Sequence, residues 1–304
     1  MRQHAEDDAE IERRMPKPQD TDLEREGFEI RPMSRADLDL AVEWAAAEGW
    51  NPGLADAGCF HATDPEGFLM AFRAGEPVAS ISVVRYAGGF AFLGFYIVRP
   101  ELRGRGYGLR LWRAGMARLE GSTVGLDGVV GQQANYASSG FALAHRNIRY
   151  GGVARLDAPS DRRLTNIGPD LVPAVAAYDR RFFPAPRGSF LQCWLRPEQR
   201  MGVALTETGA IQGYGVVRKC RSGHKIGPLF AETEDHADLL FRALASTATD
   251  GPIFLDVPEP NRAGATLAAR HGLSPVFETA RMYRGVAPAL PLDGIYGITT
   301  FELG

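Results

Sequence analysis

The sequence has few cysteines and no pattern typical of a metal site. Its three cysteines, Cys59, Cys193 and Cys220, lie far apart, are odd in number and form no C-x-x-C pair. This spacing indicates neither a disulfide framework nor a zinc site, and we expect a reducing compartment. No two of the six histidines form an H-x-x-x-H pair, so no bound metal is predicted.

Long apolar runs and a strong charge of one sign are also missing. No apolar stretch is long enough to span a membrane, and the amino terminus has no signal-peptide core. The formal net charge is −3, which gives no general attraction to nucleic acid. We therefore expect a cytoplasmic protein that binds neither membranes nor nucleic acid.

The length and the hydrophobic content predict about two domains. A chain of 304 residues exceeds the usual size of one domain, and 45% hydrophobic residues suffice for two cores. Residues 1–26 are rich in charge and poor in large apolar side chains, so they are predicted to form a disordered acidic tail. The first domain is predicted at 27–155 and the second at 161–304, joined by the Gly- and Pro-containing segment 151–160.

The most informative segment lies at a predicted strand-to-helix junction. Aromatic and β-branched residues predict a buried strand at Phe90–Val98, and apolar residues at helical spacing predict a helix that follows the loop. The N–H groups at the start of such a helix can bind a diphosphate. Gly106 and Gly108 would let the anion approach the main chain, and Arg103 and Arg105 add positive charge.

Three interpretations of this loop compete. A Rossmann dinucleotide site needs G-x-G-x-x-G and a carboxylate about 20 residues later, whereas the chain has G-x-G-x-G and no suitably placed carboxylate. A surface turn that binds nothing is the second interpretation. The third is R-x-x-G-x-G at Arg103, Gly106 and Gly108, which resembles the acetyl-CoA loop of the GCN5-related N-acetyltransferases, the GNAT family.

A second motif at the right distance strengthens this resemblance. The sequence Tyr-x-x-x-Gly-Phe begins at Tyr136, after a predicted strand at 122–130 and before another at 146–153. The order of elements over roughly residues 28–155 is similar to that of the GNAT family. The resemblance implies direct transfer of an acetyl group from acetyl-CoA to an amine, with Tyr136 protonating the leaving thiolate. The alternative is that Tyr136 only packs a helix against the sheet.

The second half repeats the order of elements without these motifs. The segment 227–233 replaces the Arg/Gly loop and carries Glu232, and Ala268 stands where a tyrosine is expected. The resemblance therefore implies an α/β (α+β) protein of two tandem GNAT-like folds, each a mixed twisted sheet flanked by helices, the second degenerate. This arrangement resembles a bacterial tandem acetyltransferase subfamily.

The implied reaction needs an acid, a base and a polarised carbonyl. A protonated amine must lose a proton before attack, and the thiolate must gain one. Tyr136 is the predicted acid; the base is Asp127 or Tyr96, and Asp127 is preferred although it could equally be a turn carboxylate. N–H groups near Ile97 and Val98 would polarise the thioester carbonyl. The predicted cofactor-binding residues are Ile97, Val98, Arg103, Gly104, Arg105, Gly106, Tyr107, Gly108 and Asn135.

The acceptor is expected to bind between the first predicted helix and the second predicted strand, where aromatic, amide and carboxylate side chains gather. The junction between the two domains could close the same cleft. We favour a small-molecule amine over a protein lysine, and acetyl-CoA is the expected co-substrate. A monomer and a homodimer both remain open. The predicted acceptor-binding residues are Glu43, Trp50, Asn51, Asp56, Asp256, Glu259 and Tyr296.

Two other kinds of function fit the sequence less well. The chain could be an acyl-CoA-binding regulatory protein without turnover, or an interaction scaffold in which both halves are degenerate. The intact loop around Gly106 argues against the scaffold. The terminal run 291–304 is more apolar and aromatic than a solvated tail. It is expected either to dock beside the cleft of the first domain or to complete the sheet of the second.

Overall fold

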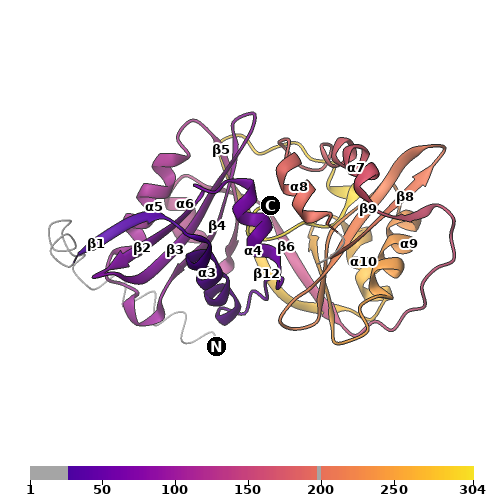
Figure 1. The fold of residues 1–304 in the computed structure, drawn as a ribbon, viewed down its shortest axis with the longest axis horizontal. Helices are drawn as coiled ribbons and strands as arrows, with labels where there is room; N and C mark the ends of the chain where they lie inside the picture. Colours follow the sequence, from indigo (N-terminus) through magenta and orange to yellow (C-terminus); the bar gives the residue numbers. More distant parts are fainter. Residues whose placement is uncertain (1–26, 197–199) are drawn as a thin grey trace.

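The computed structural model describes residues 27–196 and 200–304 (Figure 1). The tail predicted at 1–26 lies outside the described residues. A single mixed sheet of 13 strands runs through both halves, with helices packed against it. The α/β class predicted from the sequence is confirmed. No helix in the part of the chain that the structure describes is long and apolar enough to cross a membrane.

Helix α3, which follows β1 in the first half, has a side-chain cap at its start. Ser34 accepts a hydrogen bond from the backbone N–H of Asp37, and the Asp37 side chain accepts one from the Ser34 N–H, which makes a capping box. The elements of this half are β1 (Phe28–Pro32), α3 (Arg35–Ala47), α4 (Asp56–Thr63), β2 (Phe68–Arg73), β3 (Glu76–Tyr86), β4 (Phe90–Val98), η1 (Pro100–Leu102), α5 (Tyr107–Arg118), β5 (Thr123–Val129), η2 (Val130–Gln132), α6 (Gln133–Ser138) and β6 (Ala142–Gly152).

The second half follows the predicted order and adds elements that the sequence did not indicate, among them α8 and β12. Its elements are β7 (Leu164–Asn166), η3 (Pro169–Leu171), α7 (Val172–Asp179), α8 (Gly188–Trp194), β8 (Arg200–Glu207), β9 (Ala210–Lys219), β10 (His224–Ala231), α9 (Glu234–Ala245), β11 (Ile253–Pro258), α10 (Arg262–Arg270), β12 (Ser274–Arg284), η4 (Leu292–Gly294) and β13 (Ile295–Gly297).

The two halves exchange strands at the middle of the sheet. The strand order is β1-β2-β3-β4-β5-β12-β6-β11-β10-β9-β8-β7, and β13 pairs with β10. Thus β12 of the second half lies between β5 and β6 of the first half, while β6 pairs with β11 of the second half (Figure 1). If the chain is divided at residues 151–160, the first half supplies β6 to the second half, and the second half supplies β12 to the first. Neither half has a free sheet edge at the junction.

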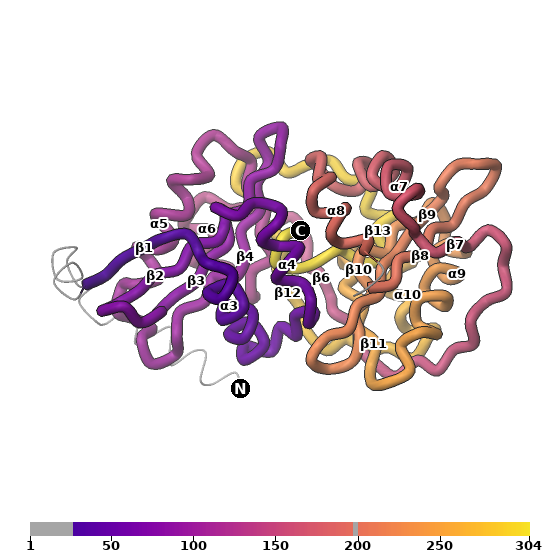
Figure 2. The backbone as a smooth tube through the Cα atoms, in the orientation of Figure 1, coloured from indigo at the N-terminus to yellow at the C-terminus, as the bar shows by residue number. Residues whose placement is uncertain are grey.

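The core is shared in the same way. One buried cluster lies between the sheet and α5 and includes Ala280 and Met282 of β12, and a second is formed almost entirely by the second half. A third cluster contains Phe60 and Phe95 from the first half together with Trp194 and Phe301 from the second. The carboxyl terminus lies at the centre of the molecule (Figure 2), where Leu303 is only 1% exposed. The halves are therefore joined by a continuous hydrophobic core as well as by the sheet.

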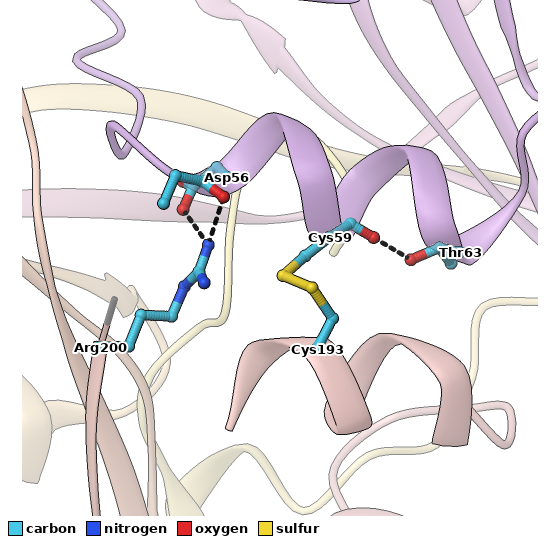
Figure 3. Close-up of a disulfide and its surroundings, with 6 residues drawn as sticks. Asp56, Cys59, Thr63, Cys193 and Arg200 are labelled. Carbon is cyan, nitrogen blue, oxygen red and sulfur yellow. Dashed lines mark hydrogen bonds and ion pairs between the residues drawn. A yellow bond between two sulfur atoms is a disulfide. The ribbon is translucent and has the colours of Figure 1, made fainter. Parts of the chain in front are cut away.

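A disulfide between the halves corrects the prediction made from cysteine spacing. Cys59 of α4 and Cys193 of α8 are bonded, with Cα atoms 5.3 Å apart (Figure 3). Phe60 stacks on Trp194 directly beside the bond. The spacing gave no sign of this pair because its members are 134 residues apart and meet only through packing of the two halves. Cys220 is buried and free.

Candidate active site

Strands β4 and β5 run parallel and then separate. Their ladder pairs Phe90 with Thr123 and ends where Leu93 pairs with Leu126, although both strands continue. Just beyond that point Phe95 has a φ of 46°, and the Ser80 hydroxyl donates a 2.8 Å hydrogen bond to the Phe95 carbonyl. This local distortion bends β4 away from β5. Within the described residues, no strand pairs with β4 on this side beyond Leu93.

The Arg/Gly loop follows β4 and ends at the N-terminus of α5. Gly106 is the N-cap residue of α5 with a φ of 85°, and no side chain caps the helix. Gly104 also has a positive φ, of 74°. These left-handed conformations favour glycine. The uncapped N-terminus presents backbone N–H groups and the positive end of the helix dipole, which suits a diphosphate.

Among the other residues of the loop, Gly108 and Arg103 make contacts with neighbouring elements, whereas Arg105 points to solvent. A Cβ on Gly108 would lie 2.7 Å from Val98 Cγ2 and 2.8 Å from the Tyr96 hydroxyl oxygen, so glycine at 108 is needed for packing of α5 against β4. Arg103 donates to the Val98 carbonyl and forms a 2.5 Å ion pair with Glu48. Arg105 is exposed at the rim. It is therefore the arginine best placed to meet an anion.

A pocket of about 460 Å³, its open mouth included, lies where β4 and β5 separate. It brings together four residues predicted from the sequence, Trp50, Tyr96, Asp127 and Tyr136. Its other lining residues come from β4 and β5, from β12 and from the terminal run. They are Leu93, Gly94, Phe95, Leu126, Gly128, Val129, Phe277, Thr279, Phe301 and Glu302.

Tyr136 is well placed as a proton donor. Its ring lies 5.8 Å from that of Trp112 and packs so tightly on Gly128 that a Cβ there would lie 2.2 Å from it. Burial raises the pKa of the Tyr136 hydroxyl to about 12 because the phenolate would lose its hydration. The hydroxyl therefore carries its proton at neutral pH.

Asp127 lines the same pocket but already has strong partners. Its two carboxylate oxygens accept hydrogen bonds of 2.8 and 2.6 Å from Arg281, and Oδ1 accepts a third, of 2.7 Å, from Asn147. Burial raises the pKa of the Asp127 carboxyl, an effect that Arg281 and Asn147 oppose. To act as a base, Asp127 would have to accept a proton on oxygens that already bind the Arg281 guanidinium. These contacts favour a positioning role.

Three of the acceptor-binding candidates form contacts between the halves outside the pocket. Asp56 is buried and accepts hydrogen bonds from Arg200 and Arg218, both at 3.1 Å (Figure 3 shows Arg200). Glu43 forms an ion pair with Arg221 at the surface. The Asn51 side chain exchanges two hydrogen bonds with the backbone of Ser222. These contacts join α3, α4 and the segment between them to the second half.

The other candidates lie in the second half. Asp256 accepts two hydrogen bonds from Arg149, at 2.6 and 2.8 Å, inside the sheet. Glu259 is exposed beyond β11, and Tyr296 is buried in β13. Trp50, which does line the pocket, is fixed by its carbonyl, which accepts hydrogen bonds from Arg149 and Lys225. The structure thus brings Trp50 alone of this predicted set to the pocket.

Among the cofactor candidates, Asn135 is exposed on α6 and bonds to Gln132. Ile97 and Val98 lie on the part of β4 that has left β5. The residues that sequence reasoning missed are Phe277, Thr279 and Glu302. The apolar character of the chain end was the signal for the segment that holds Glu302, whereas no pattern had marked β12, which holds Phe277 and Thr279.

The corresponding place in the second half, between β10 and β11, is occupied by another strand. Strands β10 and β11 pair in parallel only from His224 to Ile226, but β13 then pairs with β10 at Leu229 and Phe230 and fills the space. The Thr233 side chain caps α9, and Glu232 pairs with Arg181. A hollow beside α9 is therefore lined by Thr233, which caps α9, and by the carboxylate of Glu232.

This arrangement is that of a tandem acyltransferase whose candidate site lies where β4 and β5 separate. The profile of the Acetyltransferase (GNAT) family matches residues 33–142, and that of an Acetyltransferase (GNAT) domain matches 175–297. A holothin acyltransferase from Pseudoalteromonas sp. (strain SANK 73390) is 34% identical over 284 residues, 92% of this chain and 96% of that protein. The chain belongs to the GNAT family and is an acyltransferase.

Solved structures share the fold. A candidate acetyltransferase from Pyrococcus horikoshii superposes with a TM-score of 0.77 at 22% identity and covers 91% of this chain and 96% of its own. A tandem GNAT protein from the clavulanic acid biosynthesis pathway gives a TM-score of 0.58 at 17% identity, over 86% of this chain and 99% of its own. At these identities the likeness shows the tandem fold alone.

Proposed function

We propose that the chain transfers an acetyl group from acetyl-CoA to a small-molecule amine, directly and within a ternary complex. The observation that carries this proposal is the pocket where β4 and β5 separate. It holds the buried Tyr136 and is closed on one side by the second half through Phe277 and Phe301. The Arg/Gly loop lies at the end of the same strand, β4.

The proposed cofactor site extends from the loop into the opening. The diphosphate would rest on the backbone from Gly104 to Gly108, with Arg105 at its rim. The pantetheine arm would then lie along the exposed edge of β4, near the N–H groups of Ile97 and Val98, where one of them polarises the thioester carbonyl. Asn135 on α6 would contact the arm from the other side.

The proposed mechanism needs no covalent enzyme intermediate. The amine lone pair attacks the thioester carbon, and the developing oxyanion is stabilised by β4 N–H groups. Tyr136 then donates its proton to the departing CoA sulfur. Because the Tyr136 hydroxyl has a pKa of about 12, it is fully protonated when the thiolate forms.

A small-molecule acceptor is supported by the enclosure of the pocket and by the relative. The pocket has walls from both halves, among them the aromatic side chains of Trp50, Phe277 and Phe301, and such an enclosure suits a small molecule better than a folded protein surface. The relative at 34% identity is named for holothin acylation. We propose an acceptor of similar size and do not assign holothin itself.

A panel of amines, followed by release of the CoA thiol and by the mass of the product, tests the proposal. Turnover of at least one small amine by the wild type, with a mass gain equal to one acetyl group, is expected. If acetyl-CoA binds tightly but no amine is acetylated, the chain is an acyl-CoA-binding regulatory protein instead. Acetylation of protein lysines in preference to every small amine would contradict the proposed acceptor class.

A further inference from the structure

Two buried polar atoms in the pocket have no partner. Oε1 of Glu302 and Oγ1 of Thr279 make no hydrogen bond within the described residues, and both residues are 2% exposed. Both line the same pocket. Buried polar groups in proteins nearly always have a partner, since leaving one unpaired costs about 1–3 kcal/mol. Two such atoms in one pocket indicate a ligand that completes their hydrogen bonds.

The chain end holds Glu302 at the point where the strands separate. A Cβ on Gly94 would lie 2.4 Å from the Glu302 carbonyl oxygen, and Gly94 is the first residue after the last β4–β5 pair. The Leu303 carbonyl accepts a 3.0 Å hydrogen bond from the Tyr86 hydroxyl, and the Leu303 N–H donates to Thr300 Oγ1 at 2.9 Å. The terminal run is therefore fixed against β4.

Charges around Glu302 act on its carboxyl without binding it. Lys225, Arg218 and Arg149, on β10, β9 and β6, favour the carboxylate, while Asp56 on α4 opposes it. Each of these cations has a hydrogen-bond partner of its own. Burial raises the pKa of the Glu302 carboxyl, an effect that the cations partly offset. A carboxylate with a raised pKa is a stronger base than an ordinary one, and Oε1 of Glu302 has no partner among the described residues. Glu302 is therefore suited to accept a proton.

The groups facing Glu302 across the pocket do not compete for this task. Asp127 on β5 is bound by Arg281 and Asn147, and Tyr136 on α6 is protonated. Tyr96 on β4 packs on the Trp112 ring, with centroids 5.2 Å apart. Glu302 is thus the carboxylate of this pocket that has an oxygen, Oε1, with no partner among the described residues.

Building on the proposed function, we propose that Glu302 receives the proton of the acceptor amine and that the Thr279 hydroxyl binds a second polar group of the same molecule. A carboxylate only accepts hydrogen bonds, so it selects an N–H group, whereas a hydroxyl can accept or donate. Trp50, Phe277 and Phe301 supply aromatic walls. The acceptor class that fits is a small planar amine with a neighbouring polar group.

The proton path balances over the reaction. As the amine nitrogen forms its bond to the thioester carbon, its proton passes to the Glu302 carboxylate. The C–S bond then breaks, and the sulfur takes the proton of the Tyr136 hydroxyl. Return of a proton from Glu302 to Tyr136 through water restores both groups. The products are the acetylated amine and the CoA thiol.

Steady-state kinetics of Glu302→Gln test the assignment, with anthranilamide and its N-methylamide as planar amines that carry a neighbouring amide and spermidine as a non-planar amine. The variant should lose about 10²-fold or more in kcat/KM for the planar amines and should lose the acid limb of the pH profile. Acetyl-CoA affinity should stay unchanged. Glu302→Asp should recover part of the activity, and Thr279→Val should raise the acceptor KM with little change in kcat. Spermidine should be a poor substrate, and the surface variant Glu76→Gln should match the wild type.

The outcomes separate the two proposals. Wild-type kinetics and an unchanged pH profile in folded Glu302→Gln would overturn the role of Glu302 and leave the proposed function intact. If the wild type acetylates no amine of the panel, the proposed function fails, and calorimetry with anthranilamide then tests the site. Binding that Glu302→Gln weakens supports the carboxylate as the amine ligand. Equal binding to both proteins, or no binding to either, overturns it.

Discussion

At the scale of single residues, the pocket separates groups that the sequence could not tell apart. Tyr136 and Asp127 were both predicted to do acid–base chemistry, and both line the pocket. Tyr136 owes its raised pKa to burial alone. The Asp127 oxygens instead bind Arg281. Residue type and approximate position are readable from sequence, but the partners that decide a role come from strands far away in the chain.

Replacement of Tyr136 by Phe should lower kcat by about 10²-fold, because a phenylalanine keeps the ring that packs on Trp112 but removes the proton donor. The Kd for acetyl-CoA should barely change. Single-turnover kinetics, which isolate chemistry from product release, are the appropriate measurement. Tyr150→Phe, in β6 and outside the pocket, serves as the matched control. An unchanged rate of chemistry in Tyr136→Phe would mean that the tyrosine only packs.

At the scale of elements, local patterns were sufficient where neighbours in the sequence are neighbours in space. Strand β4 has the bounds predicted from its aromatic run, and the capping box of α3 likewise joins residues only three positions apart, Ser34 and Asp37. Strand β12 was missed, and β6 pairs with β11 and β12 rather than with β5. Alternating hydrophobicity identifies a strand but not its partner. Glu302 belongs to no motif, so only the fold reveals its place.

The disulfide between Cys59 of α4 and Cys193 of α8 should raise the free energy of unfolding measurably. Loss of a disulfide that closes a long loop typically costs about 2–4 kcal/mol, and the separation here is 134 residues. Cys59→Ser, or a reductant that opens the bond in the wild type, should lower the urea midpoint of unfolding. The control is the double variant Cys59→Ser/Cys193→Ser, on which reductant should have no effect. Identical midpoints for oxidised and reduced wild type would show that the link adds nothing.

At the scale of the whole molecule, the two halves are interdependent although they differ where their parallel strands separate. The second half closes the pocket with β12 and the terminal run, and its own equivalent opening is filled by β13. The terminal run therefore does both things expected of it. Its strand β13 completes the sheet of the second half, and its last residues line the pocket of the first.

The strand exchange predicts that the first half does not fold alone. In a fragment of residues 27–160, β5 would lack β12, and β6 would lack both of its partners. We expect this fragment to show no cooperative urea transition and no acetyl-CoA binding, and co-expression with residues 161–304 to restore both. Circular dichroism and calorimetry on the fragment are the tests. A fragment that folds and binds acetyl-CoA by itself would show that the exchange is dispensable.

The central claim is that one acyl-CoA site exists per chain, at the Arg/Gly loop. Isothermal titration calorimetry with acetyl-CoA measures this directly. We predict one site per chain, abolished by Gly106→Asp, which places a carboxylate at the uncapped start of α5. The matched variant Glu232→Gln, in the second half's hollow, should bind like the wild type. Two sites per chain, or a single site that survives in folded Gly106→Asp, would contradict the account.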